Sequence, residues 1–194
     1  MWHSQYSLVK ILLWVLLPTA LLAEETPYDG GQFQILLPKG FVSQQTFERD
    51  GFATHVFILT VENKLASMIQ VSTFPPNPDL EFESPDDIRQ ACVGGLSQHL
   101  MSFKRQRSNF HNSEPEDVEI DGLVGVRATW TADFEGSGLM PKLTEKGVLY
   151  VVADELGFVS IRATGDERSF DTITLRATRA IETMTIDRPN REVR

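Results

Sequence analysis

The sequence predicts an α+β fold with a mainly antiparallel sheet and two principal amphipathic helices. Three observations predict it. Short runs of alternating or β-branched apolar residues recur in both halves of the chain. Turn signals such as Asp-Gly separate neighbouring runs, as in antiparallel hairpins. Two other segments instead place apolar residues three and four positions apart, which is typical of helices packed against a sheet.

The first 23 residues differ from the rest and predict a cleavable export signal over residues 1–23. They contain no acidic residue; Lys10 precedes the apolar run Ile11–Leu17, and Pro18 and small residues follow. The run up to Ala23 is shorter than the about 20 apolar residues of a membrane-spanning helix. Cys92 is the only cysteine, so no lipid anchor can form at the cleavage site. We expect cleavage after Ala23 and a periplasmic or secreted protein with no stable membrane anchor.

The composition restricts the classes of partner and the sources of stability. A net charge of −9 opposes binding to a polyanion, so we expect no nucleic-acid partner. The short basic cluster Lys104, Arg105 and Arg107 is interpreted as a solvated face or a helix C-terminus. A single cysteine cannot form an intramolecular disulfide, and the chain is long enough to be stabilised by one apolar core. We therefore expect one domain over residues 32–187.

The first half predicts a polar leader followed by an antiparallel meander. Residues 24–31 are expected to be a flexible leader. Phe33, Ile35 and Leu37 then alternate with other residues, and Asp50-Gly51 is a strong hairpin signal. We expect four strands at residues 33–37, 41–49, 52–61 and 65–74, with turns at 38–40, 50–51 and 62–64.

A helix is predicted over residues 85–103, after a rigid proline-rich crossing loop at 75–78. Ser84 is the expected N-cap, and the next residues are a proline and two acids, as favoured in a first helical turn. One apolar stripe follows at helical spacing: Ile88, Cys92, Leu96, Leu100 and Phe103. Cys92 on this stripe is interpreted as a structural, inert thiol. Gly94-Gly95 predicts a close approach of the helix to the sheet or a kink, and packing is the favoured reason.

The second half predicts four more strands and a closing helix. We expect strands at residues 118–121, 123–134, 147–153 and 158–163, with turns at Asp121-Gly122 and 155–157. The last helix is expected to begin at 166–169 and to end near Ile186, because Pro189 prevents its continuation. Residues 188–194 are predicted to be a disordered tail.

Several of these features together resemble the PsbP-like and Mog-like superfamily, particularly its DcrB-like bacterial members. They are the run Phe33-x-Ile35-x-x-Pro38-x-Gly40-Phe41, the helix start Ser84-Pro85-Asp86-Asp87, Ile120-Asp121-Gly122 before a long strand, Tyr150, and Ser169-Phe170. The resemblance spans about residues 32–186. It implies an α-β-α sandwich and a non-enzymatic accessory role, such as assisting an envelope or photosynthetic complex or binding a partner protein. It carries no shared ligand motif.

No motif in the sequence indicates catalysis or a cofactor. His55, His99 and His111 are not at metal-ligand spacing, so we expect no metal site. Gly136-Ser137-Gly138 lacks the spacing of a hydrolase nucleophile, and no phosphate-binding or dinucleotide-binding glycine motif is present. Acid pairs, Asp86-Asp87 and Glu114 with Glu116 and Asp117, are interpreted as solvated.

One loop stands out as a candidate partner-binding site. Residues 135–142 place Leu139 and Met140 among Gly136, Gly138 and Pro141, and an exposed apolar tip could contact a partner, although these side chains could also fold back on the core. Trp130 is interpreted as a core residue.

We therefore expect an exported, non-enzymatic accessory or protein-binding domain of the cell envelope, without cofactor. The alternative is a small-molecule or lipid carrier with an apolar cavity over the sheet. A hydrolase is the third reading, and it would require two or three of the histidines to meet acids in one cleft.

Overall fold

The fold is built on one antiparallel sheet of eight strands. The computed structural model describes residues 25–62, 64–75, 82–135, 142–169 and 175–187. The strands follow the order β3-β4-β5-β10-β9-β8-β6, and β7 also pairs with β8. Their bounds are β3 (Val42–Arg49), β4 (Phe52–Val61), β5 (Lys64–Phe74), β6 (Ser108–Asn112), β7 (Glu116–Ile120), β8 (Leu123–Phe134), β9 (Leu143–Asp154) and β10 (Gly157–Asp166).

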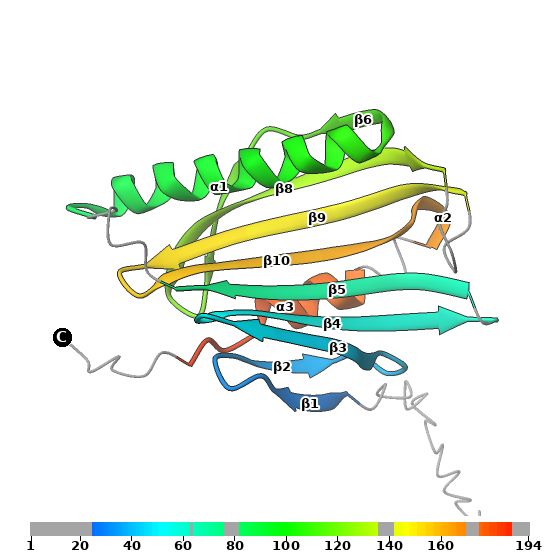
Figure 1. Ribbon diagram of the computed structural model, residues 1–194, viewed down its shortest axis with the longest axis horizontal. Coiled ribbons are helices and arrows are strands. Elements are labelled where there is room, and N and C mark those ends of the chain that lie inside the picture. Colours follow the sequence, from blue (N-terminus) through cyan, green and yellow to red (C-terminus); the bar gives the residue numbers. More distant parts are fainter. Residues whose placement is uncertain (1–24, 63, 76–81, 136–141, 170–174, 188–194) are drawn as a thin grey trace, which may run out of the picture.

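Helices lie on both faces of this sheet, which confirms the predicted α+β class (Figure 1). The long helix α1 (Pro85–Gln106) packs on β8 and β9. The opposite face carries α3 (Leu175–Glu182) and a separate hairpin of β1 (Thr26–Asp29) and β2 (Gln34–Leu37). A short helix, α2 (Glu167–Ser169), follows β10.

The alternation of side chains along β9 separates two cores. Leu149, Val151 and Ala153 belong to the core under α1, whereas Val148 and Tyr150 belong to the core under α3 and the β1–β2 hairpin. Successive residues of a strand point to opposite faces, so one apolar strand can supply both layers. Trp130 lies in the α1 core and is 1% exposed, as predicted.

The predicted hairpin turns are confirmed. Asp50 and Gly51 have φ values of 51° and 80°, and Asp121 and Gly122 have φ values of 50° and 73°. Positive φ at both central residues matches the right-handed twist of the flanking strands. β9 and β10 are both longer than predicted. β6, with the polar sequence SNFHN, was not predicted, because its residues carry no apolar alternation.

Helix α1 begins where the cap residue predicts it. The Ser84 Oγ accepts a hydrogen bond from the Asp87 N–H at 3.3 Å. The helix continues to Gln106, one turn beyond the predicted end, and its buried residues are Cys92, Leu96, Leu100 and Phe103. The close approach predicted at Gly94-Gly95 is absent. A Cβ at Gly94 would meet nothing within 4 Å, and one at Gly95 would lie 3.5 Å from Val151 Cγ1, an ordinary contact.

The chain ends differ from the expectation where they are described. Residues 26–29, expected within a flexible leader, form β1, because the Tyr28 ring packs edge-on against Phe57 at 4.7 Å between centroids. Helix α3 ends at Glu182 instead of near Ile186, and Thr185 instead pairs with Gln34 of β2. The predicted signal, most of the crossing loop and the predicted tail lie outside the described residues.

Candidate functional site

The residues that the sequence singled out do not form one site. Gly136, Leu139 and Met140 lie outside the described residues. His55 is buried on β4, where its Nδ1 lies 3.0 Å from the Tyr28 hydroxyl, on the face opposite α1. His99 lies on α1 and His111 on the edge strand β6, so the histidines do not converge. Among the described residues, no group of three His, Cys, Asp or Glu side chains could hold a metal ion.

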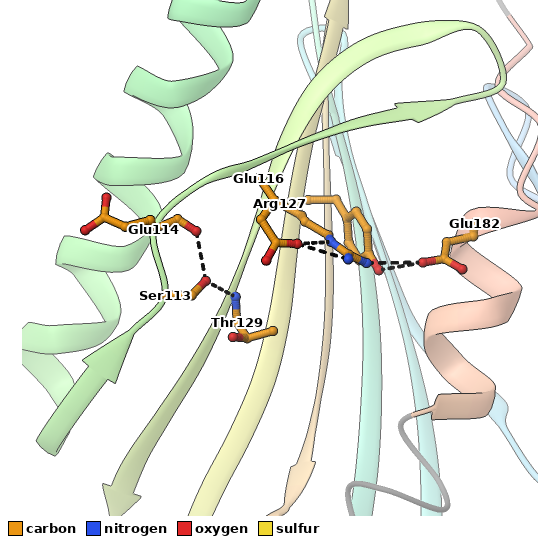
Figure 2. A network of polar contacts seen from close by, with 7 residues as sticks. Ser113, Glu114, Glu116, Arg127, Thr129 and Glu182 are labelled. Atoms are coloured by element: carbon orange, nitrogen blue, oxygen red, sulfur yellow. Dashed lines mark hydrogen bonds and ion pairs between the residues drawn. The ribbon is translucent and has the colours of Figure 1, made fainter.

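The acidic residues near β7 take part in a structural ion-pair network, which Figure 2 shows. Arg127 on β8 lies 3.0 Å from a Glu116 carboxylate oxygen and 3.4 Å from one of Glu182 on α3. The Tyr150 hydroxyl also donates to Glu182, at 3.5 Å. Burial raises the pKa of Tyr150, so this phenol is not activated as a base. The network ties α3 to β7 and β8.

A second polar cluster lies at the C-terminal end of α1, where the basic residues are found as one interpretation predicted, and it corrects the solvated interpretation for Arg107. Lys104 and Arg105 are exposed, as expected. Arg107 is not solvated: its Nε lies 2.6 Å from a carboxylate oxygen of Glu145, and the two side chains are 8% and 3% exposed. The other Glu145 oxygen accepts from the Thr164 hydroxyl at 2.7 Å.

Aromatic rings enclose this ion pair. The Arg107 guanidinium carbon lies 5.1 Å from the centroid of Phe103 and 5.2 Å from that of Trp130. Contact between a guanidinium and ring faces is favourable when both are desolvated. The sequence offered no signal for it, because Glu145 is distant in the chain and stands among ordinary strand residues.

Arg162 on β10 adds a second guanidinium beside this pair. Its carbon lies 5.0 Å from the Phe103 centroid, and its Nη2 donates to the Gln70 side-chain oxygen at 2.7 Å. Its Nε is enclosed and has no hydrogen-bond partner in the described part of the chain. Burial, with Arg107 nearby, lowers the pKa of Arg162 to about 10, against the opposite effect of Glu145.

Arg162 lies at the border of a surface that we call the open half: the α1-side face of β3, β4, β5 and β10. Helix α1 packs on β8 and β9, and no described helix crosses the strands of the open half on that side (Figure 1). Strand pairing places Arg162 opposite Gln70, and Ser72 opposite Thr54, so that these side chains share the face.

A hydrogen-bonded polar row crosses the open half from β4 to β10. The Thr54 and Ser72 hydroxyls are 2.9 Å apart, and the Gln70 amide nitrogen donates to Ser72 at 3.2 Å. Gln70 then accepts from Arg162. Four side chains from three strands are therefore linked, and all except Ser72 are only partly buried.

An aromatic row runs beside the polar row. The Phe47 and Phe52 centroids are 6.1 Å apart, those of Phe52 and Phe74 are 5.0 Å apart, and Phe74 lies 6.3 Å from His99 on α1. Phe47 is 49% exposed at the sheet edge. Burial and the nearby charge of Arg162 lower the pKa of His99.

This arrangement is suited to binding rather than to bond breaking. Rings supply apolar contact area, and the polar row supplies fixed donors and acceptors, which is the composition of a protein interface. A hollow of about 510 Å³ lies at the β3–β4 turn, between residues 30–32 and 48–53, and Phe52 of the aromatic row forms part of its lining. Core side chains fill the space between α1 and the sheet. None of the described helices is long and apolar enough to span a membrane.

Comparisons with known proteins show the fold. No family model matches the sequence, and no curated protein matches it significantly. The solution structure of cyanobacterial PsbP from Synechocystis sp. PCC 6803 matches at a TM-score of 0.54 and 14% identity, covering 87% of this chain and 96% of that one. LpqN, involved in cell envelope biogenesis of Mycobacterium tuberculosis, matches at 0.48 and 14%, covering 84% and 91%. The PsbP match supports the conclusion that this chain has a PsbP-like fold.

Proposed function

We propose that this chain is an exported, non-enzymatic accessory domain of the cell envelope that binds another protein through the open half of its sheet. One observation carries the proposal: the aromatic row and the polar row lie side by side on the open half, and α1 contacts them only at its border, through His99 and Phe103. Aromatic residues, phenylalanine among them, and arginine are enriched in protein interfaces relative to the rest of the surface.

Export is supported by the leader, with its apolar run and its small residues before Glu24. The PsbP-like fold is compatible with an accessory role but does not fix it, because one fold serves many functions. We also propose that the chain is related to the Mog-like and DcrB-like domains that its sequence resembles. The carrier alternative requires an apolar cavity over the sheet, and the filled core under α1 gives it no support.

Site-specific photo-crosslinking in the envelope tests the proposal. The full chain is expressed with its own leader, carrying a photoreactive phenylalanine analogue at Phe47 or at Leu175. Both residues are exposed, at 49% and 51%, but Leu175 lies on α3, away from the open half. We expect the same adduct from Phe47 and from a second probe at Phe52, and not from Leu175.

Excess unlabelled protein should compete for the adduct, whereas excess Phe47→Ala protein should compete poorly. Adducts that form equally from Leu175, or that both competitors remove equally, would contradict binding through the open half. N-terminal sequencing of the exported protein is expected to give Glu24 as the first residue; an uncleaved Met1 would contradict the export part of the proposal.

A further inference from the structure

We propose that Arg162 receives a carboxylate, the side chain of an aspartate or glutamate of the bound protein, and that Gln70 occupies the place of this carboxylate in the free chain. The inference rests on the proposed function and names the chemistry of the partner at the open half. It depends on the donors of Arg162, on the local balance of charge and on the position of Gln70.

The donors of Arg162 are not all used. A guanidinium carries five N–H donors in a planar fork, and its Nε–H and one Nη2–H point in the same direction, so that a carboxylate can accept both. In the described part of the chain, Nη2 donates to Gln70 and Nε has no acceptor. An enclosed donor without an acceptor is unfavourable. A carboxylate on this edge would satisfy both nitrogens, whereas the Gln70 carbonyl satisfies one.

The local charge also favours an incoming anion. Two guanidiniums, those of Arg107 and Arg162, lie within 5.1 and 5.0 Å of the Phe103 centroid. One buried carboxylate, Glu145, lies among them, and its short ion pair is with Arg107. Among the described residues, one positive charge therefore remains without a contacting counter-charge, in a chain whose formal net charge is −9.

The charges fit a carboxylate better than a phosphate. Arg107 is buried and already paired, so one guanidinium remains available to a ligand. A phosphate monoester carries about two negative charges at neutral pH and is commonly bound by several cationic groups. A carboxylate carries one charge, and its two oxygens match the two parallel N–H donors of one guanidinium. The aromatic row beside Arg162 would receive the apolar residues that flank the acid in a partner segment.

Gln70 can leave its position without disturbing the core. Its side chain is half-buried on the open half, and in the described part of the chain it hydrogen-bonds to two members of the polar row, at 2.7 Å to Arg162 and 3.2 Å to Ser72. When Gln70 turns away, Ser72 keeps its bond to Thr54. The residue therefore protects Arg162 in the free protein and yields to a better acceptor.

The first test needs no partner. Sodium acetate is titrated into the folded mature chain at constant ionic strength, with sodium chloride as the reference, and the arginine Nε–H signals are followed by NMR. Arg162→Lys identifies the Arg162 signal. We expect a saturable shift of that signal with acetate and none for Arg127, which two carboxylates already contact. An Arg162 signal that responds no more to acetate than to chloride would overturn the inference.

The second test supplies the carboxylate within the chain. Gln70→Glu should pair with Arg162, abolish the acetate response and raise the unfolding midpoint. Gln34→Glu is the matched control, because it adds the same charge at an exposed position of β2, on the opposite side of the sheet, and should leave the acetate response unchanged. If Gln70→Glu still responds to acetate, or unfolds earlier than Gln34→Glu, Gln70 does not stand in for a carboxylate.

The third test separates the inference from the proposed function. Arg162→Gln should weaken competition for the Phe47 adduct at least about tenfold, the loss expected for a charge-assisted hydrogen bond. Undiminished competition, together with a positive acetate response, would mean that the carboxylate does not come from the protein partner. If no adduct forms at all, the proposed function fails, and the acetate titration still decides whether Arg162 binds a carboxylate.

Discussion

Glu145→Gln probes the least expected feature of the molecule, the ion pair buried at the end of α1. The change keeps the shape of the side chain and removes its charge. Glu145 is 3% exposed and accepts from Arg107 at 2.6 Å and from Thr164 at 2.7 Å. Without its charge, the guanidiniums of Arg107 and Arg162 lie beside Phe103 with no compensating carboxylate in the cluster.

The expected loss of stability is large for a change that replaces one carboxylate oxygen by an amide nitrogen. Removing one partner of a buried ion pair costs about 3–5 kcal/mol, because the remaining charge stays desolvated. A domain of this size loses about 2–4 °C of melting temperature per kcal/mol, so the midpoint should fall by roughly 10 °C. The double change, Glu145→Gln with Arg107→Met, should cost less stability than the sum of the single changes. In the double variant, neither member of the pair remains as a buried charge without its partner.

Urea and thermal unfolding, followed by circular dichroism, measure both effects. The control is Lys142→Ala, which breaks the ion pair with Glu135 at 2.9 Å; both side chains are 70% exposed, and its midpoint should not move beyond error. A loss below about 1 kcal/mol for Glu145→Gln would refute the reasoning, since it would mean that solvent reaches the cluster.

Three further predictions concern the cores and their titration. Gly147→Ala should destabilise the fold by about 1–3 kcal/mol in urea unfolding, because its Cβ would lie 2.6 Å from the Trp130 ring, whereas Gly94→Ala, on an open helix face, should stabilise it by up to about 1 kcal/mol. Burial lowers the pKa of both His55 and His99, so stability should be complete above the unfolded pKa of about 6.5 and fall as the pH drops through the lower folded values. Urea midpoints between pH 7 and pH 5 check this, and His55→Phe should reduce the loss; a flat profile contradicts it. Burial raises the pKa of Cys92 to about 11, so iodoacetamide at pH 8 should label the thiol in urea and spare it in the native chain, as mass spectrometry will show.

The sequence predicted most of the fold because its local signals agree with its layers. The hairpin turns at Asp50-Gly51 and Asp121-Gly122, the Ser84 cap and the Cys92-to-Phe103 stripe each depend on neighbours in the chain, and each is present. The strand β1 was missed because its four residues are mostly polar. They form a strand through the packing of Tyr28 against Phe57, a contact that no local sequence pattern predicts.

The candidate site could not be predicted in the same way. Phe47, Gln70 and Arg162 come from three strands, and they share a face only through the register of β3, β4, β5 and β10. Arg107 showed the limit most clearly: charge runs are ordinarily solvated, and this residue departs from that rule only because Glu145 and a ring cluster surround it. Knowledge of which strands pair, rather than the composition of each segment, would have identified both the open half and the environment of Arg107.

Hydrogen–deuterium exchange of the mature chain, with and without its crosslinked partner, tests the central claim most directly. The account predicts slower exchange on binding in β3, β4, β5 and the neighbouring part of β10, with β7 and α3 unchanged. Protection confined to β7 and α3, with the open half exchanging as in the free chain, would contradict it.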